Sequence, residues 1–60
     1  MTLVLFEARL NAAKLTIRQL TVEANENPDV SPAVYGMLVA VNLILDHTHA
    51  LLAAELERAP

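Results

Sequence analysis

The chain has 60 residues, a formal net charge of −3 and no cysteine, and 55% of its residues are hydrophobic. This length allows one domain at most, so we expect a single domain covering residues 1–60. Without cysteine there can be no disulfides or thiolate metal sites, and the two histidines are too few for a closed zinc site within one chain. The acidic balance, with four basic residues, argues against broad binding to a nucleic-acid backbone.

Self-association is the source of additional stability that this composition still allows. A compact chain of this size buries only about 60% of the surface that its unfolded form exposes, so its stability alone is marginal. Phe6 and Tyr35 are the only aromatic residues, so the core must be aliphatic. Because disulfides and a closed zinc site within one chain are excluded, although a metal site shared between subunits is not, we expect a homo-oligomer, most simply a dimer.

The first 25 residues predict an amphipathic helix over about 3–25. Apolar residues recur there at alternating spacings of three and four, which is the heptad pattern of helices that pack side by side. The row consists of Leu3, Phe6, Leu10, Ala13, Ile17, Leu20 and Ala24.

The segment "NENPDVSP", residues 25–32, predicts a loop at about 26–31. Pro28 cannot lie inside a helix without removing a backbone hydrogen bond, and Asn27 and Asp29 favour turns. Ser31 followed by Pro32 is typical of a helix start, because serine caps free N–H groups and proline suits the first helical position. A second helix over about 32–58 is therefore expected.

The second helix carries two apolar rows. One row is Val34, Met37, Val41, Ile44, Thr48 and Leu51, and the other is Leu38, Leu45 and Leu52. Together they make a face wider than one partner helix covers, as in a four-helix bundle. Gly36 and Ala40 add small residues where another backbone could approach closely, although a glycine near a helix start is also simply tolerated.

The motif "DHTH" at residues 46–49 is a candidate site. At about 100° per residue, His47 and His49 point roughly 200° apart, so they cannot bind one metal ion from the same helix. His49 shares a stripe with Tyr35 and Asn42, bordered by Asp46, and we interpret this stripe as a polar interface edge. In a sharper version, Asn42 fixes the register of a symmetric helix pair, and His49 makes assembly pH-dependent.

No nucleophile or oxyanion-binding loop accompanies Asp46 and His49, so a catalytic pair is disfavoured. We therefore predict no enzyme activity, no catalytic or metal residues and no cofactor. His47 is expected to be exposed.

Lys14 and Arg18 form the main basic pair, which usually indicates a solvated face. An alternative is a nucleic-acid-binding bundle that uses Arg9, Lys14 and Arg18. Three apolar residues lie away from the main row and suit a protein-binding surface, although scattered exposed apolar residues are also normal: Val4, Leu15 and Val22.

The most apolar run, residues 32–45, has fourteen residues and contains Asn42. A spanning helix needs about 20 apolar residues, so we interpret this run as a core helix and expect no membrane association. No stretch resembles a secretion signal, and a cytoplasmic location is expected.

The predicted fold is all-α: an antiparallel two-helix hairpin that pairs as a homodimer into a four-helix bundle. It resembles the Rop-type plasmid regulators in length, single loop and heptad spacing; no motif is shared, so no functional residue is carried over. The predicted function is non-enzymatic self-association and binding of another protein as a regulator or adaptor. The predicted self-association core is Leu3, Phe6, Leu10, Ile17, Leu20, Val34, Leu38, Val41, Leu45 and Leu52. The predicted interface edge is Tyr35, Gly36, Ala40, Asn42, Asp46 and His49. The predicted partner surface is Val4, Leu15, Val22, Lys14 and Arg18.

Overall fold

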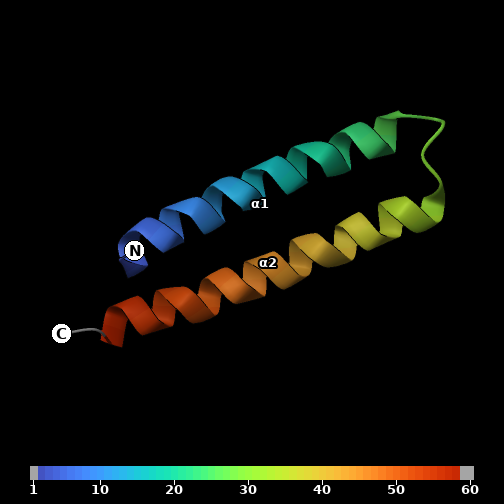
Figure 1. Cartoon of the computed structure of the whole chain (residues 1–60). Coiled ribbons are helices and arrows are strands. Elements are labelled where there is room, and N and C mark those ends of the chain that lie inside the picture. Colours follow the sequence, from blue (N-terminus) through green and yellow to red (C-terminus); the bar gives the residue numbers. More distant parts are fainter. Residues whose placement is uncertain (1, 59–60) are drawn as a thin grey trace.

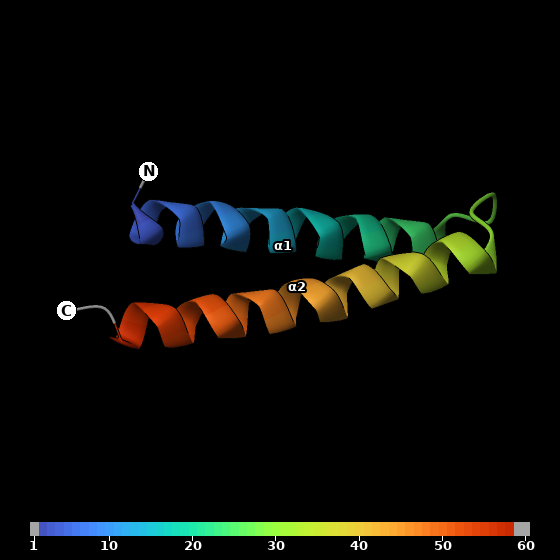
Figure 2. The ribbon, with the colours of Figure 1, turned by 60° about the horizontal axis from the view of Figure 1, so that its bottom comes forward.

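The structure is a computed structural model that describes residues 2–58 as a hairpin of two helices (Figure 1). Helix α1 spans Leu3–Glu26 and helix α2 spans Pro32–Arg58. The helices run antiparallel and lie side by side in both ribbon views, with the loop at one end and the two termini at the other (Figure 2). The predicted all-α hairpin is thus confirmed. Residues 1, 59 and 60 of the predicted domain lie outside the described residues.

Both helices begin with a hydroxyl cap. The Thr2 hydroxyl accepts a hydrogen bond from the backbone N–H of Leu5 at 3.1 Å, and the Ser31 hydroxyl accepts one from Val34 at 3.2 Å. These bonds satisfy N–H groups that have no partner within the helix. Pro32 occupies the first position of α2, where its missing N–H costs nothing.

The loop is closed by short local hydrogen bonds. The backbone N–H of Asp29 donates to the Asn27 side-chain oxygen at 2.9 Å, and that of Val30 donates to the Asn27 carbonyl at 3.1 Å. Asn27 in turn donates its own N–H to the Ala24 carbonyl at 3.4 Å. This tight turn around Pro28 brings the two helices into an antiparallel pair.

The two helices meet along rows that repeat every seven residues. The contacting row of α1 is Glu7, Leu10, Lys14, Ile17, Thr21 and Ala24, and that of α2 is Tyr35, Leu38, Asn42, Leu45, His49, Leu52 and Leu56. Alternating spacings of three and four are the geometry of helices that pack nearly parallel to one another. Three of the six residues in the row of α1 and four of the seven in the row of α2 are aliphatic, and the others are largely polar.

The contact uses only part of the apolar row expected on α1. Leu10, Ile17 and Ala24 face α2, whereas Phe6 and Leu20 remain 49% and 45% exposed. The reason is that α2 packs against the side of the helix that carries Glu7, Lys14 and Thr21. On α2, likewise, the leucine row at 38, 45 and 52 faces α1, and much of the second apolar row stays in solvent.

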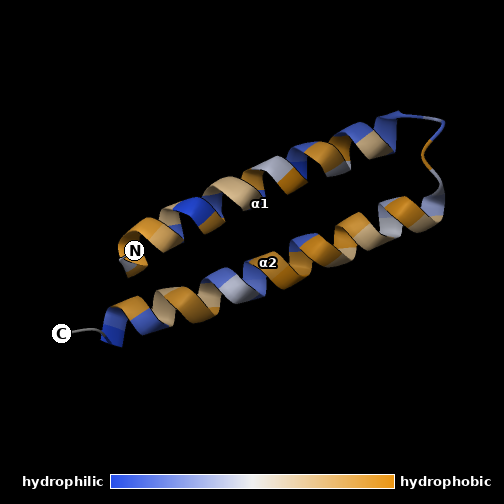
Figure 3. Ribbon diagram, in the orientation of Figure 1, coloured by the Kyte–Doolittle hydropathy of each residue, from blue (hydrophilic) through white to orange (hydrophobic). Residues whose placement is uncertain are grey.

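The hairpin buries little of its apolar surface. Among residues 2–58, only Ala24 and Leu52 are buried. Hydrophobic residues occur along both helices over their whole length, while the loop is mainly hydrophilic (Figure 3). The accessible surface is 4602 Å², whereas the size scaling of compact monomers gives about 3,800 Å² for a chain of this mass. The single hairpin is therefore more open than a compact monomer.

Within the single hairpin Gly36 lies in open space, so helix α1 makes no close approach to it. A Cβ added there would meet no atom of the described hairpin within 4 Å, and its φ is not positive. Gly36→Ala should therefore raise the free energy of unfolding by about 1 kcal/mol through helix propensity alone.

Urea unfolding at matched protein concentration measures this change. Ala40→Gly, on the same exposed side of α2, is the control and should lower the free energy of unfolding by a similar amount. A loss of stability in Gly36→Ala would instead mean that another chain packs against this position.

Candidate interaction surface

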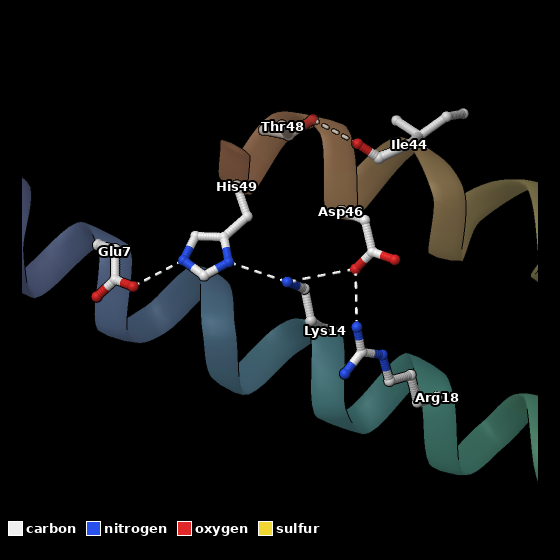
Figure 4. A network of polar contacts seen from close by, with 7 residues as sticks. All are labelled: Glu7, Lys14, Arg18, Ile44, Asp46, Thr48 and His49. Atoms are coloured by element: carbon white, nitrogen blue, oxygen red, sulfur yellow. Dashed lines mark hydrogen bonds and ion pairs between the residues drawn. The ribbon is translucent and has the colours of Figure 1, made fainter. Parts of the chain in front are cut away.

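Five side chains form a polar ladder on one side of the hairpin (Figure 4). The imidazole of His49 lies between Glu7 and Lys14, and Asp46 lies between Lys14 and Arg18. His49 Nε2 is 2.7 Å from Glu7 Oε1, and His49 Nδ1 is 2.9 Å from Lys14 Nζ. Asp46 Oδ1 is 3.3 Å from Lys14 Nζ and 2.9 Å from Arg18 Nη2. The ladder joins α1 to α2 over several helical turns.

The ladder fixes the tautomer of His49. A lysine ammonium can only donate, so Nδ1 of His49 is the acceptor in its bond to Lys14. The ring proton therefore lies on Nε2 and is donated to Glu7. Lys14 is central to the ladder, because its side chain is only 12% exposed while it bonds both residues of α2.

Asp46 is held as a carboxylate by the two cations of α1. The hydrogen bond from Lys14 is the main cause that keeps the pKa of Asp46 below its usual 3.8, and Arg18 adds to it, while partial desolvation acts in the opposite direction. Asp46 is consequently ionised at neutral pH and counts as a structural partner of Lys14 and Arg18.

Asn42 continues the polar contacts toward the loop. Its amide donates to the Thr21 hydroxyl at 2.7 Å and to the carbonyl of Leu38 at 2.8 Å. The Thr21 hydroxyl donates in turn to the Ile17 carbonyl at 2.7 Å. The structure therefore places Asn42 between the helices of one hairpin, where a polar pair in a contact row sets the register.

The residues of the predicted interface edge lie on different sides of helix α2. Tyr35, Asn42 and His49 face α1 at intermediate exposure, whereas Gly36 and Ala40 are exposed on other sides of α2. His47 is exposed, on the opposite side from His49. Asp46 makes its ion pairs with Lys14 and Arg18, so Lys14 separates it from His49 (Figure 4). Within residues 2–58, no group of three or more potential metal-ligating side chains comes together.

The predicted partner surface is also divided. Val4, Leu15 and Val22 are exposed, at 69%, 51% and 58%. Lys14, expected in a solvated pair, is instead covered by the contact between the helices. Arg18 remains 52% exposed but is paired with Asp46. Sequence reasoning did not assign Glu7 and Thr21 to the contact; their spacing of seven residues from Lys14 was the signal that could have placed them.

An apolar face lies on the side of the hairpin away from the ladder. We define it by Leu3, Phe6 and Leu20 of α1 with Val34, Met37, Ile44 and Leu51 of α2, which are between 44% and 67% exposed. A groove joins the two helices on this side, and its lining residues are Leu20, Glu23, Ala24, Asn27, Val30, Val34 and Leu38. The groove on the other side is lined by Arg18, Tyr35, Val39 and Leu43 among others. Both grooves are mainly apolar with some polar residues, and the side of the ladder also carries the ion pairs of Asp46.

Helix α2 is long and apolar enough to cross a membrane, by length and composition alone. Asp46, however, lies near the middle of this helix and is paired with two cations of α1. A charged side chain at the centre of a bilayer costs about 2.5–3.5 kcal/mol.

No family model matches the chain, and neither a curated protein nor a solved structure is significantly similar to it.

We expect Asp46 to stabilise the hairpin at neutral pH and to lose this effect in acid. A carboxyl with a lower pKa in the folded state contributes fully above its unfolded pKa, and the contribution is lost as the pH falls through the folded pKa. The wild type should be more stable than Asp46→Asn at neutral pH, and the difference should shrink below pH 3.8. Urea titrations across this range measure both free energies of unfolding.

The control removes the two cations instead. In a Lys14→Met, Arg18→Gln background, Asp46→Asn should have little effect at neutral pH, because the ionised carboxyl has lost its partners. A difference between wild type and Asp46→Asn that is constant from neutral pH to about pH 3 would contradict the assignment.

Proposed function

We propose that this protein is a small non-enzymatic interaction protein whose hairpin pairs with a second copy through the apolar face. The observation that carries the proposal is the apolar face itself, because seven of the thirteen exposed large apolar side chains among residues 2–58 lie on it, against two buried residues. Soluble monomers rarely expose contiguous apolar surfaces of this extent. A second copy supplies an identical apolar surface, so both are covered at once.

The dimensions of the hairpin suit such a pair. Its principal extents are 49 × 15 × 13 Å. One long side then offers about 700 Å², and two copies would bury about 1,500 Å², which is the size of a standard stable interface. The result is a four-helix bundle, in which each helix contacts two neighbours.

In such a pair, the groove beside the ladder faces outward. It combines apolar residues with polar ones, including Val39 and Leu43 with Arg18 and Asn25. A mixed apolar and polar groove is the kind of surface that binds a protein segment, so the paired unit would act as a regulator or adaptor. The nucleic-acid alternative is weaker, because Lys14 is covered and both Lys14 and Arg18 are paired with Asp46.

Sedimentation equilibrium at micromolar concentration tests the proposal with adjacent variants of α2. Ile44 lies on the apolar face at 62% exposure, and Leu43 lies on the side of the ladder groove at 67%. We expect twice the chain mass for the wild type and for Leu43→Glu. Ile44→Glu should be monomeric, because an uncompensated buried charge costs about 3 kcal/mol or more, roughly a hundredfold in affinity.

Flotation with phosphatidylcholine vesicles tests the alternative that lipid, instead of a second copy, covers the apolar face. A wild-type chain that is monomeric in buffer and floats with vesicles would assign the face to lipid and contradict the proposed pairing. Equal loss of the dimer in Leu43→Glu and Ile44→Glu would contradict the placement of the interface.

A further inference from the structure

We propose that the two copies pair in opposite directions, with α1 beside α1 of the second copy and α2 beside α2. This inference rests on the proposed self-association and adds the orientation of the partner. It depends on the charges that border the apolar face and on the level of these charges along the hairpin.

Each helix carries an outer row at the edge of the apolar face, with a spacing of seven residues. The outer row of α1 is Arg9, Thr16 and Glu23, and that of α2 is Met37, Ile44 and Leu51. All six residues are exposed in the single hairpin. Glu23 lines the same groove as Leu20 and Val34, which places the row of α1 on the apolar side. The row of α1 therefore has a basic and an acidic end. The row of α2 is apolar from Met37 to Leu51, and Arg58 continues it at the last position of the helix.

The ladder fixes which residues of the two rows lie at the same level. Lys14 lies opposite Asp46 in the hairpin. Thr16 follows Lys14 by two residues and Ile44 precedes Asp46 by two, so in antiparallel helices Thr16 is level with Ile44. The centres of both outer rows thus lie at one height.

A single two-fold axis perpendicular to the helices at this height pairs the residues of both outer rows favourably. It brings Arg9 to Glu23 of the second copy, because each lies seven residues from Thr16 on either side. It also brings Met37 to Leu51 of the second copy and Ile44 to its own counterpart. Opposite charges meet twice, and apolar residues meet apolar residues, as a symmetric interface requires.

Thr16 is compatible with a position on this axis. Its hydroxyl donates to the Ala12 carbonyl of its own helix at 3.1 Å, so covering it leaves no hydroxyl proton unbonded. Ala13 and Leu20 lie between the outer row and the contact with α2. In opposed copies, Ala13 of one copy comes to nearly the same level as Leu20 of the other, so a small residue meets a large one.

The alternative axis, parallel to the helices, gives a poorer match. It places α1 beside α2 of the second copy at the levels seen within the hairpin, so Arg9 lies near Leu51 and Glu23 near Met37 of that copy. Both charges would then be desolvated against apolar side chains without a partner, which is unfavourable. The pattern of charges therefore selects the opposed arrangement.

Spin-label distances in the dimer separate the two arrangements. The described chain has no free cysteine, and Asp29 is exposed in the loop, so Asp29→Cys gives one label per copy at the loop end. With opposed copies, the loops lie at opposite ends, and we expect a distance of about 40 Å or more from helices of this length. With parallel copies, the loops lie together, within about 20 Å, since neighbouring helix axes are 8–10 Å apart.

A charge exchange tests the contact itself. Arg9→Glu and Glu23→Arg should each weaken dimerisation about tenfold by opposing like charges at two symmetric positions, and the double variant should restore it. Arg9 and Glu23 are four turns apart in one helix, so restoration requires contact between copies.

A long loop-to-loop distance together with restoration supports the opposed arrangement. A short distance, or a double variant weaker than both single variants, overturns it while the dimer itself stands. A monomeric wild type in sedimentation would overturn the self-association as well, so the two failures are distinguishable.

Discussion

The hairpin is governed by a limit of helix packing: one helix covers only one line of contact on its neighbour. Helix α2 has a leucine row at 38, 45 and 52 that packs against α1, and a second row from Val34 to Leu51 that, apart from Val41, α1 leaves exposed. Apolar residues outside the contact stay in water. Burying them would stabilise the structure by about 25 cal/mol per Å² of apolar surface. The exposed face and the proposed pairing of copies both follow from this limit.

The polar ladder determines which half of each apolar face remains free. Because Glu7, Lys14 and Thr21 form hydrogen bonds with α2, the hairpin closes on the side of these residues. Such bonds contribute less stability than well-packed apolar residues often do, but they specify the register. The same choice leaves Phe6 and Leu20 on the opposite side. The ladder and the apolar face are thus two results of one contact.

The helices and the loop could be predicted because their signals are local. Pro28 interrupts the helical pattern, and Ser31 and Pro32 begin the next helix through a cap and a preset backbone angle. Both signals depend on residues close in sequence, and the structure has the helices and the loop at the expected places. The heptad spacing was right for only part of its row: Leu10, Ile17 and Ala24 face α2, whereas the other residues of that row stay exposed.

The partners of the polar residues could not be predicted in the same way. Periodicity identifies the faces of a helix, but it does not say which face meets the neighbour in the same chain. Lys14 resembled a solvated residue, because a long side chain can cover apolar surface and still reach polar partners. His49 and Asp46 are close in sequence, yet each takes its partners from α1. Such contacts depend on how the two helices are rotated against each other.

The central claim is that folding of the hairpin is coupled to coverage of its apolar face by a second copy. The most direct test is the dependence of the thermal unfolding midpoint on protein concentration, followed by circular dichroism at fixed pH and salt. A folded dimer that unfolds to separate chains must become more stable with concentration, so the midpoint should rise steadily over about a hundredfold range. A midpoint that stays constant over this range, with full helix content at the lowest concentration, would contradict the account.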